Sequence, residues 1–457
     1  MNRSAERNIP EKCTRRGFAH KAGLAGGLAA VGFPMIVPAR VLGKNAPSKR
    51  VSVGFIGLGR QWDGSNIQPF LEAEDATVTA LCDVDAWRLE SGKKKVEGYY
   101  AGKSASGTYK GVRTFGDFRQ LIALREVDAV MISTTDHWHV PMSLLAVKAG
   151  KDVCCEKPLT ISIEEGRWLA DAVKKRKCVF RTDSEFRSIP QFHRMAELAR
   201  NGRIGRIHTI YTGVPKSDIT HPPEPEMPVP PELDYASWLG PAPLAPYTLK
   251  RVHAPQDLKS RPGWMRVRDY CEGLITNWGT HLNDIAQWCN GTDRTGPVEV
   301  EATGVYPPQT NLWNVLLEMQ AVYKYANGVT LHYKMDRPFV RLEGDEGWLE
   351  YEYTTKDLKA SSEKILNSVI TDKEIRFPLK HEKRDWLDAI KTRGQTLEDA
   401  EVGHRTCSLC QLAHISIQLG GRKLKWDPDK ERFDHPEANQ LKKRKSWRAP
   451  WTPKSFR

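Results

Sequence analysis

The chain has 457 residues, a length that suits two domains. With 40% hydrophobic and 27% charged residues, its composition excludes a disordered, collagen-like or polytopic membrane protein. The formal charge of +13 comes from the two ends: residues 1–44 carry +6 and residues 441–457 carry +7, which leaves 54 basic and 54 acidic residues between them. A neutral body argues against a nucleic-acid partner.

Residues 1–44 have the pattern of an export signal. Arg15 and Arg16 are followed by Phe18 and Lys21, and then by an apolar, Gly/Ala-rich run of about 16 residues. A membrane-anchoring helix is the alternative, but the run falls short of the roughly 20 residues that span a bilayer. We therefore expect a twin-arginine address, a periplasmic or other extracytoplasmic location and no stable membrane span.

Short β-rich runs alternate with helical patterns between residues 45 and 182. The runs expected to be strands are residues 51–56, 77–82, 129–133, 152–155 and 178–181. Because strand and helix alternate, we predict a parallel sheet with right-handed crossovers, that is, an α/β Rossmann domain. The continuously apolar strands fit a sheet that helices cover on both faces.

Residues 183–440 follow a different pattern. Helices are expected near 187–201 and 280–288, on either side of a Pro-rich stretch. Four alternating runs follow, at residues 298–306, 313–325, 329–333 and 348–353. They predict an α+β domain with a largely antiparallel open sheet, whose neutral face would suit a homo-oligomer, either a dimer or a tetramer. The basic tail, residues 441–457, has a Pro and Trp content that suggests a segment strapped to its own or a neighbouring subunit.

A glycine turn follows the first expected strand. Gly57 and Gly59 stand directly after this strand and are followed by Arg60 and Gln61. Glycines here let backbone amides approach a pyrophosphate, and the N-terminus of the next helix adds partial positive charge. Trp62 replaces the third glycine of the usual fingerprint, so we expect a looser or shifted helix start.

Asp83 stands at the end of the second expected strand. A carboxylate there can accept hydrogen bonds from ribose hydroxyls and would repel a 2′-phosphate, which favours NAD over NADP. The alternative is that Asp83 begins a turn or caps a helix. Together with the glycine turn and its two following residues, Asp83 is a candidate cofactor-binding residue.

Residues 149–158 read A-G-K-D-V-C-C-E-K-P and resemble the E-K-P motif of the Gfo/Idh/MocA oxidoreductases. The likeness extends to T-T-D-H-W-H at 134–139, N-G-R-I-G at 201–205 and G-T-H-L-N-D at 279–284. It covers roughly residues 50–452, and E-K-P is its most specific part. Sheet topology would place E-K-P at the carboxyl edge of the strands, where open α/β sheets bind ligands.

The resemblance implies that Lys157 lies beside the nicotinamide and handles the proton of a sugar or polyol hydroxyl as hydride leaves its carbon. That role needs a lysine able to release its proton near neutral pH, which desolvation and a positively charged nicotinamide favour. Glu156 is expected at the cofactor, and a surface ion pair between the two side chains is the alternative. We also expect a cis peptide bond before Pro158, at a tight turn into the site.

His281 and Asp284 are three residues apart and can share a helix face. The family often has an acid four residues before this histidine, where this chain has Asn277, which cannot titrate. With Lys157 as the principal acid/base, we expect His281 to hydrogen-bond the reacting hydroxyl and Asn277 to bind substrate. Asp284 would orient or charge-stabilise a partner. A polar core pair is the alternative for the histidine and the aspartate.

Four residues around the start of the helix after the expected strand at 129–133 are candidate cofactor contacts: Thr134, Asp136, His137 and His139. N-capping is a sufficient alternative for the aspartate. No acidic or Cys partner stands at ligand spacing from the two histidines, so we expect no metal. Arg187 and Tyr270 are candidate substrate hydrogen-bonders.

These observations predict an exported NAD(P)-dependent oxidoreductase that acts on CH–OH groups of a sugar, glycoside or polyol. Its layout is similar to that of the glucose–fructose oxidoreductases, so the cofactor is expected to stay bound if it crosses the membrane with the folded protein. One alternative is an NAD-dependent glycoside hydrolase or lyase that works through a transient keto-sugar. Another is a non-catalytic sugar-binding member of the fold.

Overall fold

The computed structural model describes residues 50–103, 111–216 and 219–457. Residues 50–457 form one compact unit. The predicted twin-arginine signal and its membrane-anchor alternative lie outside the described residues. Within the described part of the chain, none of the helices combines the length and the apolar character needed to cross a membrane.

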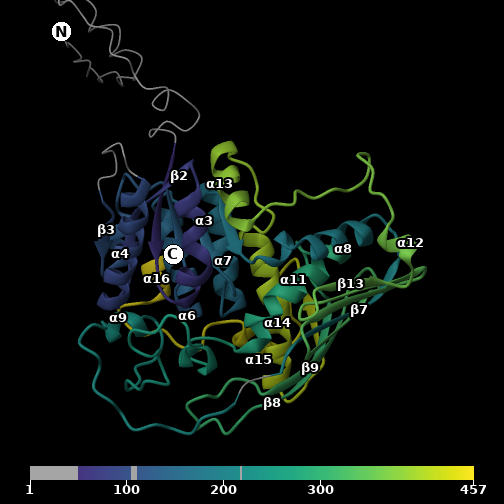
Figure 1. Cartoon of the computed structure of the whole chain (residues 1–457). Helices are drawn as coiled ribbons and strands as arrows, with labels where there is room; N and C mark the ends of the chain where they lie inside the picture. The colour runs from purple at the N-terminus through teal and green to yellow at the C-terminus, as the bar shows by residue number, and fades with distance from the viewer. Residues whose placement is uncertain (1–49, 104–110, 217–218) are drawn as a thin grey trace, which may run out of the picture. The chain divides into compact units, whose positions relative to one another are not determined.

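The first half of the unit contains a six-stranded parallel sheet in the order β3-β2-β1-β4-β5-β6 (Figure 1). Its strands are β1 (Val51–Ile56), β2 (Ala76–Cys82), β3 (Arg113–Phe115), β4 (Ala129–Ile132), β5 (Asp152–Glu156) and β6 (Phe180–Asp183). The predicted Rossmann-type sheet is confirmed. The short strand β3 was not predicted, because its three residues include two exposed ones and carry no apolar run.

Helices cover both faces of this sheet. The packing of buried side chains assigns α5 (Phe118–Ile122), α6 (Asp136–Lys148) and α7 (Ile163–Arg176) to one face. The other face is covered by α3 (Ile67–Glu72), α4 (Ala86–Lys103) and, from far along the chain, α13 (Glu382–Thr392). Trp386 of α13 is fully buried and meets Phe70 of α3 edge-on, with ring centroids 5.8 Å apart.

The second half contains a nine-stranded sheet in the order β13-β12-β11-β7-β10-β9-β8-β14-β15. Its strands are β7 (Ile207–Pro215), β8 (Glu299–Val305), β9 (Glu318–Lys324), β10 (Thr330–Asp336), β11 (Phe339–Gly344), β12 (Gly347–Glu352), β13 (Asp357–Ala360), β14 (Leu424–Asp427) and β15 (Arg432–Phe433). All pairs are antiparallel except β7 with β10, so the predicted largely antiparallel sheet is confirmed. Strand β9 alternates exposed and buried residues, as expected for a sheet with one covered face.

Three helices cover that sheet: α8 (Pro190–Arg200), α11 (Gly279–Asn290) and α14 (Ala400–Gln418) (Figure 1). The Pro-rich stretch has little regular structure beyond the short helix α9 (Tyr235–Leu239). The remaining short helices are η2 (Trp62–Asn66), η3 (Phe186–Ser188), η4 (Gly263–Arg266), α10 (Leu274–Asn277), α12 (Glu363–Leu366), α15 (Pro436–Leu441) and α16 (Pro453–Phe456).

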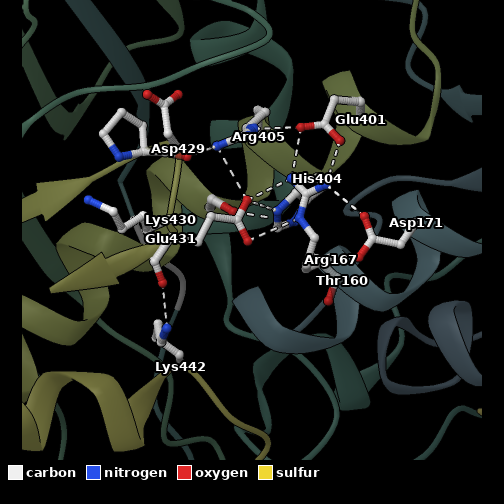
Figure 2. Close-up of polar contacts among 12 residues, drawn as sticks. Thr160, Arg167, Asp171, Glu401, His404, Arg405, Asp429, Lys430, Glu431 and Lys442 are labelled. Carbon is white, nitrogen blue, oxygen red and sulfur yellow. Dashed lines mark hydrogen bonds and ion pairs between the residues drawn. The ribbon is translucent and has the colours of Figure 1, made fainter. Parts of the chain in front are cut away.

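An ionic cluster fastens the end of the chain to the first half (Figure 2). Arg167 of α7 donates to Glu401 of α14, with both N–O distances 2.8 Å, and to Glu431, with distances of 2.7 and 3.2 Å. His404 Nε2 lies 2.6 Å from Glu431 Oε1. Burial raises the pKa of Glu431, but hydrogen bonds from His404 and Arg167 outweigh it and lower that pKa to about 2. These contacts join α7 of the first half of the described unit to α14 and to the segment near β15.

Candidate active site

A cavity of about 400 Å³ lies at the carboxyl edge of the parallel sheet, a volume typical of cofactor and ligand pockets. Its walls come from the loops after β1, β2, β3, β4 and β5, and from residues far along the chain, in the segment 234–265 and at Asn277 and Trp451. The lining residues among the sequence candidates are Gly57, Gly59, Arg60, Gln61, Asp83, Thr134, Asp136, His139, Glu156, Lys157 and Asn277. The fold thus brings together residues that are spread over more than half of the sequence.

The glycine turn after β1 is shaped for a close approach. Gly57 has φ +87°, and a Cβ there would lie 2.8 Å from backbone atoms of Ser133 and Thr134, so no larger residue fits without moving the β4 loop. The chain enters a helix at Arg60 and passes through the π-helical turn η2, which starts at Trp62 and buries that side chain. The helix start is therefore not shifted, but the helix is looser than an α-helix from Trp62, which stands where the third glycine is missing.

Asp83 is held against the glycine turn. Its Oδ2 accepts a hydrogen bond from the amide of Leu58 at 2.6 Å, and its Oδ1 accepts one from the amide of Asp85 at 2.9 Å. Burial raises the pKa of Asp83, while the Arg88 guanidinium and these amides favour its charged form. The side chain is therefore an acceptor fixed at the place where a Rossmann fold binds ribose. Together with the glycine turn, which lets the loops after β1 and β4 lie against each other, it fits a dinucleotide.

Lys157 follows β5 and reaches across to the second half of the chain. Its Nζ donates to the backbone carbonyl of Asn277 at 3.1 Å, and the peptide bond between Lys157 and Pro158 is cis, as predicted. Asn277 also lines the cavity. The contact between Lys157 and a main-chain carbonyl could not be predicted from the sequence, because it does not depend on which side chain residue 277 carries.

Glu156 is buried beneath the cavity wall. Its Oε1 accepts from Asn66 Nδ2 at 2.8 Å, and its Oε2 accepts from the amide of Lys157 at 3.2 Å. Burial, followed by the negative charge of Asp183, raises the pKa of Glu156 to about 8. Asp183 in turn pairs with the buried Lys383 of α13. Sequence reasoning missed Asn66 and Lys383, because neither lies in a recognisable motif.

This raised pKa predicts a pH-dependent stability. The carboxyl would ionise near its usual pKa of 4.5 in the unfolded chain but near 8 in the folded chain, so the folded state binds more protons between these values. The contribution of Glu156 to the free energy of unfolding is therefore complete below about pH 4.5 and is lost as the pH rises to about 8. Glu156→Gln, which keeps an acceptor for Asn66, should lack this loss.

Chemical denaturation of both proteins at intervals from pH 5 to 9 measures the effect. The free energy of unfolding of the wild type, minus that of the variant, should fall with rising pH and level off above about pH 8. An advantage that grows with pH would contradict the buried, neutral carboxyl.

His281 lies near the lysine but under the cavity surface. Its Nδ1 is 2.9 Å from Ser184 Oγ, and its ring stacks on Phe186 with centroids 4.2 Å apart. Burial, followed by the positive charge of Lys157, lowers the pKa of His281 well below its usual value, so the ring is neutral at pH 7. A neutral ring can orient a hydroxyl, and none of the described residues hydrogen-bonds its Nε2.

Asp284 and Arg187 form a buried ion pair away from the cavity. Arg187 donates through Nε and Nη2 to the two carboxylate oxygens of Asp284, each at 2.7 Å, and Nη2 also reaches Asp293 at 3.1 Å. The exposed fractions of the two side chains are 2% and 0%. The structure gives no contact between this pair and the cavity lining, so the predicted catalytic role of Asp284 and substrate role of Arg187 are replaced by a role in the core.

His137 and Tyr270 also lie behind the wall rather than in it. The two rings pack together with centroids 5.1 Å apart, and His137 Nε2 is 3.1 Å from the carbonyl oxygen of Leu239. Burial, followed by the charge of Arg444, lowers the pKa of His137 to about 3. Because its polar contact is to the main chain, the predicted cofactor contact of His137 and substrate contact of Tyr270 are corrected to packing roles.

His139 and Asp136 do reach the cavity lining, with Thr134. His139 lies between the loops that follow β4 and β5. Its Nδ1 is 2.7 Å from the Pro158 carbonyl oxygen, and its Nε2 is 3.3 Å from that of Thr134. Burial lowers the pKa of His139 to about 4, and burial raises the pKa of Asp136 well above its usual value. Among the described residues, no group of three or more His, Cys, Asp or Glu side chains is placed to hold a metal ion.

Two distant segments complete the cavity. Sequence reasoning considered Trp238 and Trp264 of the first as platforms for sugar faces but favoured core packing, and it assigned no residue of the second to the site. One is the segment 234–265, which supplies His253, Asp257 and Trp264 among others. The other is the basic tail, residues 441–457, which supplies Trp451. Their Trp and Pro content was a visible signal, but only the fold shows that they face the nucleotide loops.

Comparison with known proteins agrees with this geometry. Residues 51–184 match the model of the oxidoreductase family, NAD-binding Rossmann fold, and residues 220–453 match the C-terminal alpha/beta domain of the same family. The 1,5-anhydro-D-fructose reductase of Ensifer adhaerens is 32% identical over 115 residues, which cover 24% of this chain and 34% of that protein. A glycosyl hydrolase family 109 protein of Shewanella pealeana is 29% identical over 176 residues, which cover 36% of this chain and 38% of that protein.

These matches span little more than a third of either relative's own length. Among solved structures, a levoglucosan dehydrogenase in complex with NADH and levoglucosan aligns with a TM-score of 0.60 at 17% identity, covering 82% of this chain and 99% of that one. At that identity the likeness concerns the fold. Since the two family models together match both halves of the described unit, the chain belongs to the Gfo/Idh/MocA oxidoreductase family.

Proposed function

We propose that this protein is an NAD-dependent oxidoreductase that acts on a CH–OH group of a sugar, glycoside or polyol. The observation that carries the proposal is the shared cavity: Lys157 and Asn277 line the same space as the Gly57 turn and Asp83. A proton-transferring group and a dinucleotide-shaped loop are thereby joined in one site. The reductase and dehydrogenase names of the relatives support the same class of substrate.

The residues that would hold the cofactor are on one edge of the sheet. Gly57, Gly59 and the following helix start would cradle the pyrophosphate, and Asp83 would accept from the adenosine ribose, which favours NAD over NADP. When bound, the nicotinamide supplies the acceptor for the two electrons that leave the carbinol carbon. Thr134, Asp136 and His139 line the wall between this region and Lys157.

Lys157 would act as the acid/base. In the oxidative direction its amine takes the proton of the reacting hydroxyl, and in the reverse direction its ammonium returns that proton. The Asn277 carbonyl holds Nζ in place at 3.1 Å. His281, which is neutral, would orient the hydroxyl through Nε2, and the Asn277 side chain would hydrogen-bond a neighbouring hydroxyl of the substrate.

We extend the proposal to the cellular setting. Residues 15–37 support export by the twin-arginine route to the periplasm or another extracytoplasmic compartment. Free nucleotide is scarce there, so we propose that the cofactor stays bound and is recycled by a second carbohydrate substrate. We also propose a homo-oligomer through the open face of the nine-stranded sheet.

The test begins with nucleotide content. The purified protein is denatured, and the released nucleotide is identified by chromatography and mass spectrometry. A sugar and polyol library is then screened for products by mass. We expect about one NAD per chain, or saturable NADH binding to the stripped protein, and a keto-sugar or lactone product. A protein that neither contains nor binds a dinucleotide would overturn the proposal.

We keep a second candidate function because several relatives are named glycosyl hydrolase family 109 proteins. A transient oxidation could cleave a glycosidic bond without net redox change. The E-K-P lysine argues against it, because we expect this motif to differ in that group. Products separate the two functions: a released aglycone without net change in NADH supports cleavage, whereas a stable oxidised sugar supports the oxidoreductase.

A further inference from the structure

Residues 442–457, which we call the strap, cross the helices of the first half and add a side chain to the cofactor cavity. The strap is fastened first at Arg444. Its guanidinium donates to both carboxylate oxygens of Glu165, at 2.7 and 3.0 Å, and to the carbonyl of His137 at 2.7 Å. The exposed fractions of the Arg444 and Glu165 side chains are 5% and 1%, so this is a buried, bidentate anchor.

Further contacts attach the strap to α7 and to the 234–265 segment. Trp447 stacks on Trp168 of α7, with centroids 6.4 Å apart. Arg448 donates to the carbonyls of Ala236 and Ala242, at 2.7 and 3.2 Å. These two contacts tie the strap to the 234–265 segment that forms the opposite wall.

Trp451 follows these attachments in the chain and lines the cavity. Its ring meets Trp138 edge-on with centroids 5.0 Å apart, lies 6.2 Å from Phe118, and has the Arg119 guanidinium over it at 5.2 Å. The side chain is half-buried. Its position is therefore fixed by aromatic neighbours while part of its surface faces the cavity.

The neighbours of Trp451 identify the half of the cavity that it borders. Phe118 and Arg119 follow β3, at one edge of the sheet, next to the β2 loop that carries Asp83. Lys157 follows β5, on the other side of β1 and β4. The strap thus reaches the side of the cavity where the ribose-binding carboxylate lies, opposite the acid/base.

We propose that Trp451 is a cofactor-binding residue whose indole packs against the adenine of the dinucleotide, so that the strap slows release of the cofactor. The inference rests on the proposed function. Adenine presents a flat π surface, and aromatic contacts with a base raise affinity about 5- to 150-fold. The buried ion pair of Arg444 holds the strap, and with it Trp451, in place, so the contact that Trp451 adds lowers the dissociation rate of the cofactor.

The chain offers a matched control. Trp447 lies on the same strap and is also stacked and half-buried, but it packs on Trp168 and is absent from the described cavity lining. Trp451→Ala should raise the Kd of the stripped protein for NADH and for ADP-ribose about 10- to 100-fold. Its Kd for nicotinamide mononucleotide, which lacks adenine, should stay within about threefold. Trp447→Ala should stay within about threefold for all three ligands, and Trp451→Phe should recover most of the affinity.

Calorimetric titration of the full-length variants gives these constants, and stopped-flow displacement gives the release rate of NADH. Circular dichroism and a thermal scan show whether each variant is folded. Unchanged ADP-ribose affinity in folded Trp451→Ala would overturn the inference, as would an equal loss in Trp447→Ala or a failure of Trp451→Phe to recover. If the wild type binds neither NADH nor ADP-ribose, the proposed function itself fails. If the wild type binds both ligands but the Kd values of the variants do not follow the expected pattern, the proposed function stands and the proposed role of Trp451 is wrong.

Discussion

Lys157→Ala should lower kcat for the carbohydrate substrate by about 10²- to 10⁴-fold while the protein keeps its nucleotide. The alanine cannot take the hydroxyl proton. Among the described residues, no other side chain donates to the Asn277 carbonyl, so none stands ready in the place of the lysine amine. The cofactor would still be held by the Gly57 turn and Asp83. The loss therefore falls on the chemical step, and the affinity for NADH should change by less than about threefold.

Steady-state kinetics and nucleotide titration of the same preparations separate these effects. Lys157→Arg keeps the positive charge but cannot release a proton at neutral pH, so it should be about as inactive as the alanine variant. Lys174→Ala, on the exposed side of α7, is the matched control and should match the wild type. Turnover by Lys157→Ala within tenfold of the wild type would remove the lysine from the mechanism. A binding protein that keeps the fold would show the same ligand affinity with and without this side chain.

Arg187→Ala should lower the free energy of unfolding by about 3–5 kcal/mol. The reason is the carboxylate that it leaves behind: Asp284 is fully buried and would lose both of its 2.7 Å ionic hydrogen bonds. Urea denaturation at a fixed, saturating NADH concentration measures the change, because bound ligand otherwise shifts apparent stability. The KM of folded Arg187→Ala for the sugar should stay within about threefold.

The double variant Arg187→Met with Asp284→Leu is the control, because it removes both charges together. It should recover most of the stability lost by the single variant. If Arg187→Ala instead keeps its stability and raises the KM of the substrate tenfold or more, the original sequence-based role in substrate binding is restored.

Local patterns in the sequence were enough to predict much of the fold. The alternation between residues 45 and 182 predicted the parallel sheet, because strand and helix periodicities follow from local backbone geometry. The Gly57 turn, Asp83 and the E-K-P segment, with its cis proline, were also visible, since each is a short motif next to a strand. The edge strand β3 and the exposed strand β13 carried too little apolar signal to be found.

The sequence by itself determined the fold class, the family and the positions of the nucleotide turn and Lys157. Only the tertiary structure decided which neighbouring candidates serve the cavity. It paired Arg187 with Asp284, turned His137 toward a carbonyl, set Lys383 near Glu156 and brought Trp451 to the cavity lining. The physical reason is that a motif constrains its own backbone, whereas a charged or aromatic side chain acquires its role from partners that folding brings to it from distant parts of the chain.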